Sequence, residues 1–87
     1  MKIIIVSHGD LSLAMLRSAE MIVGPLPQAE AFGLQPAAET EQFLQQIEQA
    51  IAIAIDKKEE IVVFTDLFFG TPFNIVNRLY EKYSFLH

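Results

Sequence analysis

The hydrophobic positions of this chain form short continuous runs that alternate with longer stripes at helical spacing. Residues 3–6 and 61–65 are runs rich in β-branched side chains, a pattern typical of buried strands in a parallel sheet. Residues 29–34, AEAFGL, predict a weaker strand between them. Apolar side chains recur every three or four residues over 11–22 and 43–55, which predicts two helices, each with one apolar face.

Turn and cap residues set the limits of these elements. Gly24-Pro25 ends the first predicted helix, and Glu39-Thr40 begins the second. The charged segment 56–60 is a solvated loop. Thr71-Pro72 predicts the start of a third helix that runs to about residue 82, because threonine is a good N-cap and proline is tolerated at the first helical position. Residues 83–87 resemble the lead into a fourth strand.

The order of elements is β-α-β-α-β-α, which predicts an α/β fold. Alternating strands and helices form a parallel sheet covered by helices on both faces, with right-handed crossovers. We expect an open, doubly wound sheet with strand order 2-1-3, followed by a fourth strand that is missing from the chain.

Composition narrows the classes of function. The chain has 87 residues, enough for one small domain, with 52% hydrophobic residues and a net charge of −5. It carries no cluster of Lys and Arg, which argues against nucleic acid and anionic membrane surfaces as partners. Cysteine is absent, which excludes disulfides and thiolate zinc sites. The apolar runs are too short for a signal peptide or a membrane span, so we expect a cytoplasmic protein.

The chemistry of the sequence centres on two residues that are far apart along the chain. His8 follows the first predicted strand and Asp66 follows the third. In a 2-1-3 sheet these strands are neighbours about 5 Å apart, and sites form beyond the carboxyl ends of strands where the winding reverses. A carboxylate that accepts the Nδ1 proton leaves Nε2 of the imidazole free to act as a nucleophile or base. A loop or capping role for either residue is the simpler alternative.

Three further residues suggest an anion site beside His8. Gly9 lets the backbone after His8 approach a ligand closely. Gly70 and Thr71 stand where the third helix begins, and helix N-termini bind anions through their free N–H groups. A nucleophilic imidazole that faces a phosphate cradle suggests phosphoryl transfer through a covalent intermediate.

Two motifs resemble the IIA domain of the mannose-family sugar phosphotransferase system. SHGDLSLAMLRSAEMIVG is similar to the family's stretch around its phosphorylated histidine. FTDLFFGTPFN is similar to the signature Asp-x-x-Gly-Gly-Ser/Thr-Pro-Phe-Asn. The resemblance extends over most of the chain and places both motifs at the predicted strand ends.

The resemblance implies a phosphotransferase that works through a phosphohistidine. His8 would accept a phosphoryl group from the phosphocarrier HPr and pass it to a IIB domain, which phosphorylates sugar that arrives through the membrane subunits IIC and IID. Asp66 would orient His8, and Thr71 would hydrogen-bond the phosphate. The family needs no metal and no organic cofactor for this step.

The sequence departs from the family pattern in two ways. Phe69 replaces the first glycine of the usual pair, so a side chain stands beside the expected anion site. The chain also ends before the family's fourth strand, so residues 1–87 are interpreted as a single IIA-type domain that is incomplete at its C-terminus. An uncovered hydrophobic edge on the third strand favours self-association, as a homodimer or a larger assembly.

Three alternative functions remain open. A related phosphotransfer subunit delivers its phosphoryl group to a dihydroxyacetone kinase. A hydrolase or mutase with an N-terminal catalytic histidine generally has Arg-His-Gly, where this chain has Ser7 before His8. A non-catalytic or regulatory binding module would keep the fold without the transfer.

Overall fold

The fold of the chain is described by a computed structural model for residues 1–66, 74 and 77–78. The elements are β1 (Lys2–His8), α1 (Leu11–Val23), β2 (Ala29–Leu34), α2 (Thr40–Asp56) and β3 (Ile61–Thr65). All five lie close to the predicted bounds. Residues 74, 77 and 78 are helical, as expected for the third helix. The rest of that helix and the predicted lead into a fourth strand lie outside the described residues.

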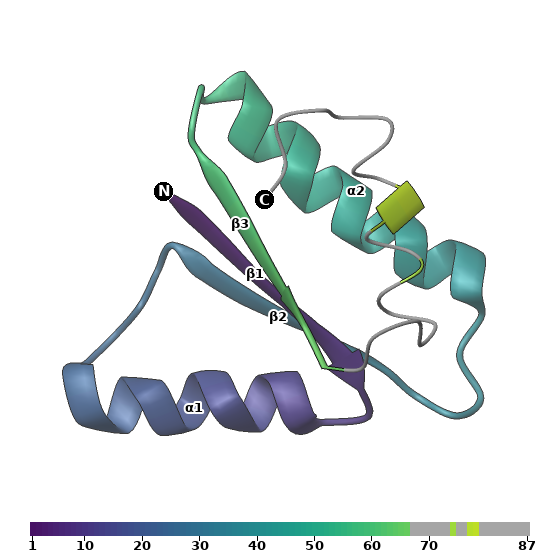
Figure 1. The fold of residues 1–87 in the computed structure, drawn as a ribbon, viewed down its shortest axis with the longest axis horizontal. Coiled ribbons are helices and arrows are strands. Elements are labelled where there is room, and N and C mark those ends of the chain that lie inside the picture. The colour runs from purple at the N-terminus through teal and green to yellow at the C-terminus, as the bar shows by residue number, and fades with distance from the viewer. Residues whose placement is uncertain (67–73, 75–76, 79–87) are drawn as a thin grey trace.

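The three strands form a parallel sheet in the order β2-β1-β3, which confirms the predicted topology. The register pairs Ile3 with Ala29 on one side of β1, and Ile3 with Val62 on the other. The two helices lie on opposite faces of this sheet: Figure 1 shows α1 below the strands and α2 above them, with β3 nearest the viewer. A chain that winds outward to β2 and then back across β1 to β3 must place its two right-handed crossovers on opposite faces.

The hydrophobic core lies between the sheet and α2. Every position predicted for the apolar face of α2 is buried or, at Ile55, packed against the core. Ile47 and Ile51 are almost completely removed from solvent, as are Ile4 and Val6 of β1. The core of the described residues consists of Ile4, Val6, Phe43, Leu44, Ile47, Ala50, Ile51, Ala54 and Ile61.

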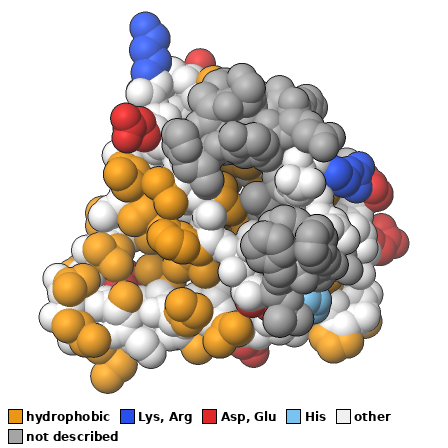
Figure 2. All heavy atoms as spheres, in the orientation of Figure 1, with side chains coloured by type: hydrophobic (Ala, Val, Ile, Leu, Met, Phe, Trp, Pro, Cys, Tyr) orange, Lys and Arg blue, Asp and Glu red, His pale blue; other side chains and the backbone are white. Residues whose placement is uncertain are grey.

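Helix α1 forms where it was predicted, but its apolar stripe is largely exposed. Met15 is 53% exposed and Ile22 is 84% exposed, and Ser12 is the buried residue of this helix. Within the described part of the chain, this helix packs mainly on β1 and β2, and Phe64 of β3 is also exposed. Figure 2 shows hydrophobic side chains gathered over α1 and β3 on the face turned to the viewer.

Among the described residues, no helix combines the length and the apolarity that a bilayer crossing requires.

Candidate functional site

The candidate site lies at the carboxyl ends of the two central strands. His8 is the last residue of β1, and Asp66 directly follows β3. The parallel register pairs Val6 with Thr65, so the two strands reach the same edge of the sheet together. The structure therefore brings His8 and Asp66 together, although they are separated by 58 positions in the sequence.

One carboxylate oxygen of Asp66 holds His8 at two points. Asp66 Oδ2 accepts a hydrogen bond from the backbone N–H of His8 at 2.9 Å. The same oxygen lies 2.9 Å from His8 Nδ1. An ionised carboxylate can only accept, so the proton of this second contact is on Nδ1. The two contacts together fix both the backbone and the ring of His8 relative to β3.

This geometry leaves the second ring nitrogen of His8 for chemistry. With the proton on Nδ1, the neutral imidazole presents a lone pair at Nε2. The His8 side chain is 45% exposed, whereas that of Asp66 is only 11% exposed. The carboxylate is thus enclosed where it orients the ring, and the ring can be reached from outside. The arrangement suits an imidazole that acts as a nucleophile or as a base.

Gly9 adopts the left-handed conformation that favours glycine, with φ of +54°, and a Cβ built there would meet no atom within 4 Å. Its N–H donates to the Leu34 carbonyl oxygen at 2.8 Å. A role for Gly9 in phosphate binding would therefore come from the open space beside its backbone, since its N–H is already bonded. Gly70 and Thr71, and the departure at Phe69, lie outside the described residues.

A buried pair of serines supports the site and was not recognised in the sequence. Ser7 Oγ accepts a hydrogen bond from the backbone N–H of Ser12 at 2.8 Å. Ser12 Oγ donates to the Phe32 carbonyl oxygen at 3.0 Å. Both serines are almost fully buried, and these bonds tie the start of α1 to β1 and β2. The sequence gives little sign of this role, because serine at a strand-to-helix turn is common.

A shallow hollow of about 320 Å³ borders His8 on the β2 side, lined in part by Gly9, Gln35 and Thr40.

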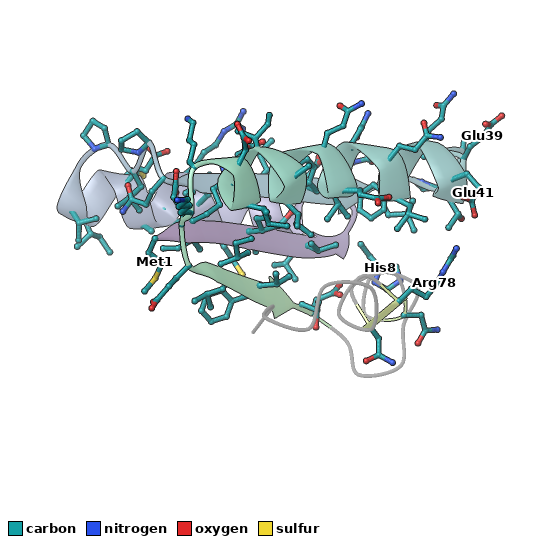
Figure 3. All side chains as sticks on the ribbon, turned by 90° about the horizontal axis from the view of Figure 1, so that it is seen from above. Met1, His8, Glu39, Glu41 and Arg78 are labelled. Carbon is teal, nitrogen blue, oxygen red and sulfur yellow. The ribbon has the colours of Figure 1, made fainter. Side chains whose placement is uncertain are left out.

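Figure 3 shows Arg78 and Glu41 at the same end of the molecule as His8. The Arg78 guanidinium lies 3.8 Å from the Glu41 carboxylate, and both side chains are mostly exposed, so this ion pair contributes little to stability. Among the described residues, no three His, Asp or Glu side chains gather as ligands for a metal ion.

The fold and the site together define an α/β protein with a histidine–carboxylate pair at the switch point of a parallel sheet. The family model described as PTS system fructose IIA component matches residues 2–84. The chain belongs to this family, which agrees with the resemblance read from its two motifs.

Individual relatives agree with this assignment. The sorbose-specific EIIA component of the PTS from Lacticaseibacillus casei is 34% identical over 84 residues, which is 94% of this chain and 58% of the relative. The PTS IIA protein associated with the fucose utilization operon of Streptococcus pneumoniae superposes with a TM-score of 0.89 at 26% identity, covering 98% of this chain and 64% of that one.

A second solved structure, the phosphotransferase system component EIIA of Streptococcus agalactiae, has a TM-score of 0.84 and 33% identity. The match covers 98% of this chain and 62% of that protein. The chain therefore spans somewhat less than two thirds of the length of the relatives it matches.

Proposed function

We propose that this protein is a phosphohistidine carrier of the sugar phosphotransferase system. His8 accepts a phosphoryl group from HPr and passes it to a IIB domain, which serves sugar uptake through the membrane subunits IIC and IID. The observation that carries the proposal is the 2.9 Å contact between His8 Nδ1 and Asp66 Oδ2, in a chain that belongs to the IIA family. This contact directs the lone pair of His8 to Nε2.

The transfer step follows from this tautomer. The Nε2 lone pair of His8 attacks phosphorus of the donor phosphohistidine, and the P–N bond of the donor breaks with its electron pair returning to the donor ring. The new phosphoimidazole retains its proton on Nδ1, so positive charge develops on the ring. Asp66 stabilises that charge through the hydrogen bond it already makes. Transfer to the IIB domain reverses the same sequence of steps.

Gly70 and Thr71 complete the proposed site as donors to the phosphoryl oxygens. Free N–H groups at a helix start and the Thr71 hydroxyl would supply hydrogen bonds to the anion. Replacing Thr71 with Val keeps the shape of the side chain and removes one such bond, worth about 1 kcal/mol or more with a charged acceptor. We expect slower phosphorylation in Thr71→Val, and equal rates in both proteins would exclude the hydroxyl from the site.

The direct test is phosphorylation of the purified chain by HPr and its phosphoenolpyruvate-driven donor system. Mass spectrometry should show the addition of one phosphoryl group, which acid removes. The chain contains two histidines, so His87→Ala is a matched control for His8→Ala. We expect the label to be lost only in His8→Ala. A wild-type chain that takes no label would favour the non-catalytic module, and one that loses phosphate to water without a partner would favour a hydrolase.

Asp66→Asn tests the role of the carboxylate in this reaction. The amide oxygen can still accept a hydrogen bond, but it carries no charge to oppose the charge that develops on the ring. Hydrogen bonds to charged groups exceed neutral ones by about 1 kcal/mol, which predicts a transfer rate lower by about fivefold in a domain that stays folded. An unchanged rate in single-turnover transfer from HPr would exclude the charge of Asp66 from the mechanism.

The proposed function includes delivery to a IIB domain and self-association of the chain. The sorbose description of the relative from Lacticaseibacillus casei supports a sugar-transport acceptor over a dihydroxyacetone kinase. Incubating the phosphorylated chain with each acceptor separates these two cases.

The exposed apolar side chains of α1 and β3 support a homodimer. Analytical ultracentrifugation should therefore give a mass above that of one chain. A monomer at all concentrations would contradict this proposal.

A further inference from the structure

Residues 8–10 form the turn between β1 and α1, called here the His8 turn. The carboxyl end of β2 approaches this turn from the side opposite Asp66. The register pairs Ser7 with Gly33 and His8 with Leu34. The N–H of Gly9 continues this ladder beyond the end of β1, because it donates to the Leu34 carbonyl oxygen at 2.8 Å. The backbone of residues 8–9 is therefore held between β2 on one side and Asp66 on the other.

Gly33 is the residue that permits this approach. A Cβ built at Gly33 would lie 1.9 Å from the Gly9 carbonyl oxygen and 3.0 Å from the Gly9 carbonyl carbon. The first distance is far inside van der Waals contact, and the atom it meets belongs to the backbone, which cannot rotate away as a side chain can. Gly33 is not among the glycines with positive φ. The need for glycine here is therefore steric rather than conformational.

A side chain at Gly33 would displace the His8 turn rather than strand β2. Strand β2 is paired with β1 along its whole length. Ser12 of α1 also donates a hydrogen bond to the Phe32 carbonyl oxygen of β2. The His8 turn lies at the end of the ladder, where a backbone hydrogen bond from Gly9 holds it to β2. A steric clash at this point would therefore displace Gly9, and His8 with it, before it displaced the strand.

A side-chain hydrogen bond also links the loop after β2 to the His8 turn. Asp10 occupies the N-cap position of α1 but makes no capping hydrogen bond with its side chain. Its carboxylate instead accepts a hydrogen bond from Gln35 Nε2 at 3.0 Å. A residue type that commonly caps a helix is thus used to hold the loop after β2 against the turn that carries His8.

We propose that Gly33 is a positioning residue for His8: it lets the end of β2 close on the Gly9 carbonyl, and this contact, together with the Gln35–Asp10 bond, fixes the His8 ring on Asp66. The part of the proposal that concerns phosphoryl transfer rests on the proposed function. The part that concerns the orientation of the ring does not.

Gly33→Ala tests the proposal through the tautomer of the His8 ring, measured from its nitrogen NMR shifts at a pH where the ring is neutral. In the wild type we expect the Nδ1–H form to dominate, because the ring nitrogen bonded to a carboxylate keeps the proton. In Gly33→Ala we expect a mixture of both tautomers, and phosphorylation by HPr slower by about 10- to 100-fold, since small displacements of a reacting group have effects of this size.

Gly24→Ala is the matched control. Gly24 has φ of +87° and no atom near its missing Cβ, so alanine strains the chain at the end of α1 without touching the His8 turn. We expect a lower midpoint of denaturation in this variant, with the wild-type tautomer and rate. A folded Gly33→Ala protein with the wild-type tautomer would overturn the proposal, as would a loss of the Nδ1–H form in Gly24→Ala.

Gln35→Ala serves if Gly33→Ala does not fold. Removing this exposed side chain breaks the tie to Asp10 and leaves the core intact, so we expect a smaller but measurable rise of the Nε2–H form. A wild-type tautomer in Gln35→Ala would then count against the proposal. If the wild-type chain takes no phosphoryl group from HPr, the proposed function fails, while the tautomer still decides the role of Gly33.

Discussion

The two helices of this protein cover the sheet in different ways. Helix α2 buries an unbroken apolar face against the sheet, with six of its residues in the core. Helix α1 has a more apolar sequence than α2, yet its buried residue is Ser12, and most of its large hydrophobic side chains are exposed. Apolar surface removed from water stabilises a fold by about 25 cal/mol per Å², so stability in the described chain rests mainly on α2.

The difference shows what α1 contributes instead. The helix is attached to the sheet through the hydrogen bonds of Ser7 and Ser12, next to the turn that carries His8. Helix α1 therefore helps to define the geometry of the site, while the buried face of α2 stabilises the sheet. Four predictions test this division, from the largest expected effect on stability to the smallest.

Ile47→Ala in α2 should have the largest effect. Ile47 is completely buried in the core, and truncation of such a side chain leaves a cavity that costs about 2–5 kcal/mol. Urea denaturation followed by circular dichroism measures the change. If the variant does not fold, Ile47→Val should still lose about 0.5–1.5 kcal/mol. A loss below this range would show that the α2 side of the sheet is not the main source of stability.

Ser12→Ala in α1 should have an intermediate effect. The substitution removes the hydroxyl that donates to the partly buried Phe32 carbonyl, at a cost of about 1–3 kcal/mol for the unsatisfied acceptor. Chemical denaturation measures this loss, and Ser18→Ala on the exposed surface of the same helix is the control. Equal stability of the two variants would contradict a structural role for the buried serine.

Glu30→Gln should have a small effect. Glu30 forms an ion pair with Lys2 between the neighbouring strands β2 and β1, and its own side chain is 48% exposed. Exposed pairs of this kind contribute about 0.2–1 kcal/mol, and salt screens them. The loss should therefore shrink when denaturation is repeated at high salt. A larger loss that salt does not change would assign Glu30 a role beyond this pair.

Ile22→Ala in α1 should have the smallest effect and is the matched partner of Ile47→Ala. Ile22 is 84% exposed, so truncation removes little buried surface. Alanine also has a higher helix propensity by a few tenths of a kcal/mol, so stability should change by less than about 0.5 kcal/mol. A loss close to that of Ile47→Ala would mean that α1 is covered in solution, as it would be in the proposed homodimer. Dilution would then make the loss smaller, because both proteins become monomeric.

The elements of the fold and the pair at the centre of the candidate site could be predicted from the amino-acid sequence. Runs of β-branched residues identified β1 and β3, and residues 29–34 gave a weaker signal for β2. The helical spacing of apolar residues identified α1 and α2, because this period follows directly from backbone geometry. The proximity of His8 and Asp66 followed from strand order alone, since the ends of adjacent parallel strands meet at one edge of the sheet.

Which apolar stripe is buried, and which residues support His8, became visible in the three-dimensional fold. Periodicity shows that a helix has an apolar face, but burial also requires a second layer against that face. The closeness of Gly33 to Gly9, and the bond between Gln35 and Asp10, depend on the register of β2 against β1. Such contacts join segments far apart in the chain, and local sequence patterns carry no information about the distance between two backbones.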